Sequence, residues 1–259
     1  ADTTAPTTAY TFPATGATNV ATNVVIRLRF NDNGGLSSNK IVVRVANATA
    51  LSDGVFTAGF VTSSTLSRTN GTDFVVVVDR GTPYAQVTTM TVRASVTDTS
   101  ANGRVTNIYF RTVDLTAPSV AYTVPATGAT NVATNVVIRL RFNDNWGVAS
   151  NRIVVRVSNA TALSNGVFLG SFVTSSTLSR TNGTDFRVVL DRTAAYGNIT
   201  MLTVRASVTD TSANGMGTNI YFRTADTTAP TTAYTIPATG ATNVATNAVI
   251  RLRFNDNGG

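Results

Sequence analysis

Aspartates are the residues of this 259-residue chain best suited to holding a metal ion. The sequence has 13 acidic residues, all of them aspartate, and it has no histidine and no cysteine. Asp32 and Asp144 lie in the letters "FNDN", and Asp114 lies in a "D-x-T-A-P" joint before the second copy of those letters. Calcium takes about six to eight oxygen ligands, generally with several converging carboxylates. Asp114 and Asp144 would be the most suitable contributors to such a site.

The charge balance nevertheless argues against calcium. Each stretch of about 110 residues carries only about six aspartates, and the whole chain has a net charge of +7. Asp32 is explained more simply as a residue that ends a strand through an Asx-turn. The sequence therefore predicts no metal site, no cofactor and no calcium-dependent stability.

Catalytic chemistry has few residues to draw on. Without histidine and cysteine, the commonest general base, the thiol nucleophile and nearly all zinc and iron–sulfur sites are missing. A serine–lysine pair would depend on Lys40, the only lysine, and Arg152 replaces it one repeat later. We expect no catalytic residues and no enzymatic activity.

The positive charge comes from arginines spread singly along apparent strands, for example Arg27 and Arg29 in "VIRLRF". Nucleic-acid-binding proteins usually cluster basic residues with aromatics between them. This spacing favours a solvated outer sheet face and no nucleic-acid partner, with anionic surface glycans or lipid headgroups as the other candidate partners. No apolar run approaches the roughly 18 residues that span a bilayer, so this segment is not expected to cross a membrane.

The chain repeats itself every 112 residues without insertion or deletion. The letters "PATGATNVATNVVIRLRFNDN" are identical at 13–33 and 125–145, and at 237–257 they change only at Ala248. Self-similarity at a fixed period indicates an array of one repeated unit. We divide the chain into repeat 1 (1–112), repeat 2 (113–224) and a partial third repeat (225–259).

Within a repeat the apolar pattern has a period of two, which indicates strands rather than helices. Runs such as "KIVVRV" and "TMTVRASV" alternate with turn clusters such as "NDNGG" and "TSANG". Strands near residues 10 and 60 complete a set of about seven per repeat, so the predicted fold is all-β, in tandem immunoglobulin-like β-sandwiches. The predicted core of repeat 1 is Tyr10, Ile26, Leu28, Phe30, Val43, Val45, Phe60, Phe74, Val76, Val92, Ile108 and Phe110.

The repeat resembles a known family. "PATGATNVATNVVIRLRFND" is similar to the opening of the bacterial Ig-like domains of S-layer proteins and large surface adhesins, and "TVRASVTDTSANGRVTNIYFRT" is similar to their last two strands. The family often has an acidic stretch where this chain has "NDN", and its late Gly-Asn turn reads Ala-Asn-Gly here. The resemblance implies an extracellular structural or adhesive module, and it fixes no ligand.

Near-identical neighbours suggest a unit that matters by being repeated, as in a spacer, stalk or fibre. The sequence therefore predicts a structural repeat protein, outside or on the surface of a prokaryotic cell, whose partner is itself. The alternative is a glycan- or surface-binding adhesin module, for which binding that depends on the single Trp146 would be the evidence. Proline fixes its own backbone and restrains the residue before it. The short joints are therefore expected to orient successive sandwiches, through Asp114 and Pro118 and through Asp226 and Pro230.

The partial third repeat holds only the first two long strands of a sandwich. Its apolar residues Ile250, Leu252 and Phe254 have no partner strands in their own 35 residues. An isolated strand pair is marginal in water, so we expect these residues to pair with protein beyond that segment. One possibility is that the sequence is a window from a longer chain, and the other is strand exchange with a neighbouring chain.

Overall fold

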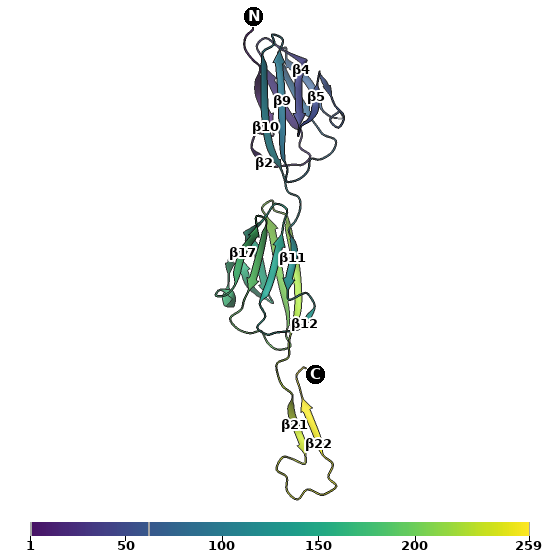
Figure 1. Cartoon of the computed structure of the whole chain (residues 1–259), viewed down its shortest axis with the longest axis vertical. Coiled ribbons are helices and arrows are strands. Elements are labelled where there is room, and N and C mark those ends of the chain that lie inside the picture. Colours follow the sequence, from purple (N-terminus) through teal and green to yellow (C-terminus); the bar gives the residue numbers. More distant parts are fainter. Residues whose placement is uncertain (1, 62, 259) are drawn as a thin grey trace. The chain divides into compact units, whose positions relative to one another are not determined.

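The computed structural model describes residues 2–61 and 63–258, and in that part of the chain it is built from strands and one short 3-10 helix (Figure 1). Contacts between residues divide the chain into a first unit that ends at Leu115 and a second unit that begins at Thr116. None of the described helical residues forms a span that could cross a membrane.

The first unit is a sandwich of a four-stranded sheet in the order β1-β3-β8-β7 and a six-stranded sheet in the order β2-β10-β9-β4-β5-β6. All neighbouring strands are antiparallel except β2 and β10, which are parallel. The strands are β1 (Thr7–Phe12), β2 (Ala17–Val20), β3 (Ile26–Asn31), β4 (Leu36–Val45), β5 (Ala48–Ser52), β6 (Val55–Phe56), β7 (Thr65–Asn70), β8 (Asp73–Val78), β9 (Thr89–Asp98) and β10 (Gly103–Thr112).

The second unit repeats this sandwich strand for strand, each strand 112 residues later in the chain. It adds the 3-10 helix η1 (Gly170–Phe172) and, from the third repeat, the two-stranded sheet of β21 (Thr231–Ile236) and β22 (Arg251–Asn255). The ten matching strands are β11 (Ser119–Val124), β12 (Ala129–Val132), β13 (Ile138–Asn143), β14 (Val148–Val157), β15 (Ala160–Ser164), β16 (Val167–Phe168), β17 (Thr177–Asn182), β18 (Asp185–Leu190), β19 (Met201–Asp210) and β20 (Gly215–Thr224).

Strand β3 shows why these residues form a sandwich. Successive side chains of a strand point to opposite faces. In β3 the side chains of Ile26, Leu28 and Phe30 are 1%, 0% and 0% exposed, whereas Arg27 is exposed. The same division holds for Ile138 and Arg139 in β13. The predicted all-β fold of immunoglobulin-like sandwiches is confirmed.

The predicted core of repeat 1 is correct except for Tyr10, which is 51% exposed. The register of β1 against β3 shifts between Thr8 and Tyr10, so Thr8 lies opposite Phe30 and Tyr10 lies opposite the outward-facing Arg29. A bulge of this kind moves the following side chain to the other face of the sheet. Tyr10 therefore points away from the core.

The strand count also differs from the expected seven, because ten strands are present in each of the two complete repeats. The strand expected near residue 60 is instead a turn, although Phe60 is buried as predicted. The four strands that the sequence did not reveal are β2, β5, β6 and β7, which are short or lie in stretches rich in turn residues. Such segments carry little periodic signal of their own and pair only because a longer strand lies beside them.

We predict that Leu28→Ala destabilises repeat 1 by about 2–5 kcal/mol, because it leaves a cavity in a fully buried part of the core. Urea unfolding of the whole chain should then separate into two transitions, since repeat 2 keeps its own intact core. The matched control is Arg27→Ala, the next residue on the exposed face, with an expected change within about 0.5 kcal/mol. Equal effects of the two substitutions would contradict the assignment of faces.

Candidate functional site

Three aspartates meet at one end of the first sandwich. Asp32 directly follows β3, Asp98 is the last residue of β9, and Asp2 lies in the segment before β1. One carboxylate oxygen of each residue lies within 4.8 Å of the corresponding oxygens of the other two. We call Asp2, Asp32 and Asp98 the carboxylate cluster.

Asp98 is the most firmly held member of the carboxylate cluster and is 1% exposed. Its Oδ1 accepts hydrogen bonds from the backbone N–H groups of Ser100 and Asn102, both at 2.8 Å, and its Oδ2 accepts one from Asn102 Nδ2 at 2.7 Å. Burial by itself would raise the pKa of Asp98, but the hydrogen bonds from Asn102 and the turn backbone outweigh it and lower the pKa. Asp98 is therefore an anion at neutral pH.

In Asp2 and in Asp32, one carboxylate oxygen accepts a hydrogen bond within a tight turn, and the other oxygen accepts none. Thr4 N–H donates to Asp2 Oδ1 and Gly34 N–H donates to Asp32 Oδ2, both at 2.9 Å. The second bond confirms the Asx-turn predicted for Asp32. The remaining atoms, Asp2 Oδ2 and Asp32 Oδ1, are buried and accept no hydrogen bond. Buried oxygens of this kind are costly unless a cation or a donor satisfies them.

Glycine 34 permits the close approach of Asp2. A Cβ atom at Gly34 would lie 2.2 Å from Asp2 Oδ2, so the Asp2 side chain would have to shift if position 34 carried a side chain. The same relation recurs between Gly258 and Asp226. In repeat 2 the corresponding residue is Trp146, whose backbone N–H donates to Asp144 Oδ2 at 2.9 Å. The turn itself is therefore kept while the side chain at this position varies.

The charge of the carboxylate cluster is not neutralised by a basic side chain within residues 2–61 and 63–258. The ion pairs found there are Arg29–Asp73 and Arg141–Asp185. Three carboxylates at this separation repel one another, and a hard divalent cation is the ligand whose chemistry suits them best. Three carboxylate oxygens would supply part of a calcium coordination shell, with backbone carbonyls and water as the usual remaining ligands.

Repeat 2 carries the same aspartates at Asp114, Asp144 and Asp210. Asp210 is held as Asp98 is, by Ser212 N–H and Asn214 N–H at 2.8 Å and by Asn214 Nδ2 at 2.7 Å. The sequence therefore named two suitable residues, Asp114 and Asp144, and missed Asp210 and its counterpart in repeat 1. The signal that could have revealed the missed residues is "TDTSANG", which is unchanged between the repeats and follows a long strand.

The other residues singled out from the sequence lie apart from the carboxylate cluster. Of the joint residues, Asp114 and Pro118 are buried, whereas Asp226 and Pro230 are exposed. In the third repeat, Leu252 and Phe254 lie in β22 opposite Thr235 and Thr232 of β21, and Ile250 directly precedes the strand. These last three side chains, Ile250, Leu252 and Phe254, are 75%, 57% and 64% exposed.

Comparison with known proteins supports the immunoglobulin-like assignment. A family model described as a bacterial Ig-like domain matches residues 114–224, which is repeat 2 without its first residue. No curated protein matches the chain. The solved structure of Rst D1-D2 is similar with a TM-score of 0.51 and 11% identity, covering 85% of this chain and 100% of that one.

Two other solved structures show weaker similarity. DIP-gamma IG1+IG2 has a TM-score of 0.44 and 8% identity, covering 86% of this chain and 98% of that one. The fibronectin(III)-like modules of Clostridium thermocellum CbhA have a TM-score of 0.28 and 11% identity, covering 85% of this chain and 94% of that one. At such identities the likeness concerns the fold alone.

The expectation of no calcium effect rested on the scarcity of carboxylates, whereas the structure gathers three of them at one point. From this geometry we now predict the opposite: calcium raises the melting temperature of repeat 1 above its value in chelator, because a cation offsets the repulsion in the carboxylate cluster. Differential scanning calorimetry of the whole chain, with calcium and with EGTA, measures the shift.

Asp32→Asn should remove most of this calcium response while leaving the chain folded, since asparagine still accepts the hydrogen bond that makes the turn. The matched control is Asp53→Asn, an exposed aspartate outside the carboxylate cluster, which should respond to calcium as the unaltered chain does. Identical melting temperatures in calcium and EGTA would show that the cluster holds no calcium.

Proposed function

We propose that this chain is part of an extracellular structural protein of a prokaryotic cell, in which tandem immunoglobulin-like sandwiches form a fibre, stalk or filament. The repetition itself supports the proposal. All ten strands of the first sandwich recur in the second at a spacing of 112 residues. The sandwich is thus repeated strand for strand within this chain.

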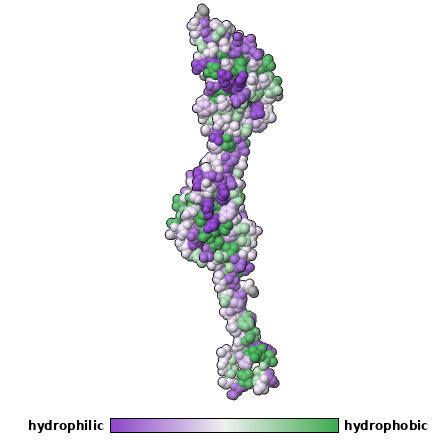
Figure 2. All heavy atoms as spheres, in the orientation of Figure 1, coloured by the Kyte–Doolittle hydropathy of each residue, from purple (hydrophilic) through white to green (hydrophobic). Residues whose placement is uncertain are grey.

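The observation that carries this proposal concerns one strand sequence, which occurs as β3, β13 and β22. Its apolar side chains are buried in the first two copies and exposed in the third. Leu28 in β3 and Leu140 in β13 are 0% exposed, whereas Leu252 in β22 is 57% exposed. Figure 2 shows hydrophobic surface over the part of the chain that holds β21 and β22. The same amino acids are covered by a sheet in two copies and face solvent in the third. An isolated strand pair is marginal in water, so the third copy needs the same cover as the first two. We infer that Ile250, Leu252 and Phe254 are the contact by which one repeat adds to further copies of the same repeat.

The partner for these residues is protein with the sequence of the repeat itself. In repeat 1 the side chains equivalent to Ile250, Leu252 and Phe254 pack in one core with residues of β4, β8, β9 and β10. Further residues of a longer chain could supply these strands, and so could a neighbouring copy. In both cases the assembled object is an array of sandwiches, consistent with a role as a spacer.

The joints between repeats suit a spacer as well. Each has the form D-x-T-A-P, with Asp114 and Pro118 in one and Asp226 and Pro230 in the next. They contain proline and no glycine, so their backbone freedom is low. We propose that they give successive sandwiches a preferred orientation.

The second candidate function, binding of surface glycans, is favoured by one feature. Outward-facing arginines lie directly opposite each other on neighbouring strands, as Arg156 of β14 does opposite Arg205 of β19. An array that also adheres would combine both functions.

The structural proposal predicts that an antibody raised against this chain labels intact, unpermeabilised cells of the source organism. Immunogold labelling in the electron microscope should follow extended surface appendages, with several particles on each because the epitope repeats along the array. Brief proteolysis of intact cells should remove the label. Labelling seen only after permeabilisation would contradict an extracellular role, and single particles without appendages would contradict the fibre.

A further inference from the structure

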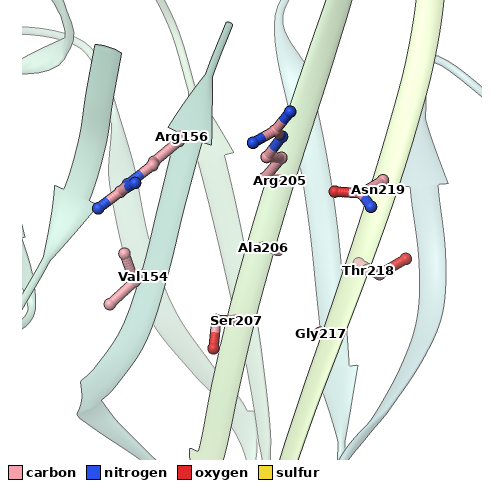
Figure 3. Close-up of a pocket in the computed structure, with 8 residues that line it drawn as sticks. All are labelled: Val154, Arg156, Arg205, Ala206, Ser207, Gly217, Thr218 and Asn219. Carbon is pink, nitrogen blue, oxygen red and sulfur yellow. The ribbon is translucent and has the colours of Figure 1, made fainter. Parts of the chain in front are cut away.

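The outer face of the six-stranded sheet in the second unit carries two arginines at directly opposed positions. Arg156 of β14 pairs in register with Arg205 of β19, and Arg205 pairs with Asn219 of β20. All three are exposed. They form one row of polar side chains across three neighbouring strands (Figure 3).

The side chains of the next row on the same face are smaller. Val154 of β14 lies opposite Ser207 of β19, which lies opposite Gly217 of β20. The two rows line a surface hollow of about 540 Å³. Gly217 brings no side chain into this hollow, and Ser207 and Asn219 lie beside it on β19 and β20 (Figure 3). We call this the arginine hollow.

The arginine pair is unfavourable for the isolated protein. Like charges directly opposite each other on antiparallel strands destabilise a sheet. Among the described residues the ion pairs join Arg29 to Asp73 and Arg141 to Asp185, so no carboxylate pairs with Arg156 or Arg205. Figure 3 shows the Arg156 side chain directed away from Arg205, so an anion held by both guanidinium groups requires Arg156 to turn toward β19. An anion bound in this way would turn the repulsion into attraction. The planar guanidinium fork binds carboxylate with two parallel hydrogen bonds.

We propose that the arginine hollow binds an acidic polysaccharide through the carboxylate of a uronic acid residue. Arg156 and Arg205 bind the carboxylate, and the Asn219 amide and the Ser207 hydroxyl hydrogen-bond sugar hydroxyls. The sugar ring lies in the space that Gly217 leaves. This inference goes beyond the structural role proposed above, since a fibre needs no ligand site.

The neighbouring side chains favour a sugar over a lipid headgroup. Tyr221 follows Asn219 by two residues on β20, so it points to the same face, and half of it is exposed. An exposed tyrosine offers an apolar ring with a polar hydroxyl, so the ring can pack against a sugar while the hydroxyl hydrogen-bonds. A site of this kind combines a hollow with a few placed polar groups, as small-ligand sites generally do.

Repeat 1 provides an internal comparison. Its corresponding row is Arg44, Arg93 and Asn107, with the same pairing between strands. The one difference in the two rows is Val105, which stands where repeat 2 has Gly217 and whose side chain projects from the same face. The proposal therefore places the sugar site in repeat 2 only. In repeat 1 the Val105 side chain occupies the space in which the sugar ring would lie.

Isothermal titration calorimetry of the whole chain with tetragalacturonate in low-salt buffer tests the proposal. We expect saturable binding with one site per chain. Arg156→Gln and Arg205→Gln should each weaken it at least about tenfold, because each removes a charge-assisted hydrogen-bonding group. Gly217→Val should weaken it similarly, while Val105→Gly should raise the number of sites per chain from one to two.

Matched controls separate this site from general attraction to positive charge. Arg44→Gln and Arg93→Gln should leave tetragalacturonate binding unchanged, and the neutral maltotetraose should not bind. Without ligand, Arg205→Gln should not lower the melting temperature, since it removes a repulsion. The proposal is overturned by absence of saturable binding, by equal losses from the arginines of both repeats, or by a drop in melting temperature on this substitution. Binding to phosphatidylglycerol vesicles without binding to tetragalacturonate would also overturn it.

Discussion

Burial of one face of the strand "VIRLRF" is the constraint on which the rest of each sandwich depends. In β3 and β13 every second side chain is enclosed between two sheets, and the arginines between them are forced to the outside. A slip of one residue would bury the arginines and expose the apolar residues, so the register is strongly fixed. Each of these strands contributes three buried residues to its core, which no disulfide reinforces.

The same register places the functional groups. Because β3 and β9 finish at the same end of the first sandwich, Asp32 and Asp98 lie beside each other although 66 positions separate them in the chain. Because β14, β19 and β20 are paired in fixed register, two arginines and an asparagine form a row on the outer face. Neither group contributes to the core. Each instead concentrates charge of one sign, which costs stability unless a ligand of opposite charge is present.

The sequence predicted the fold well because apolar alternation and the repeat are both local signals. Ile26 was correctly expected inside, and Arg27 outside. Tyr10 was misplaced because a bulge, which has no signature in the alternation, moves it to the outer face. The carboxylate cluster was not predicted: the sequence marked Asp114 and Asp144 as suitable ligands but weighed against a metal site, and the approach of Asp98 depends on how two sheets close. The arginine hollow needed the register between β19 and β20, which single-strand patterns do not contain.

The central claim is that the third copy of the strand requires the rest of a sandwich. Hydrogen–deuterium exchange followed by mass spectrometry measures it, on this chain and on a chain extended by a second copy of residues 148–224. The account predicts fast exchange at residues 250–255 in the dilute 259-residue chain and protection equal to that of residues 138–143 in the extended chain. Protection that rises with concentration in the shorter chain would identify a neighbouring copy as the source of the missing strands. Fast exchange in the extended chain, or full protection in the dilute monomer, would contradict the claim.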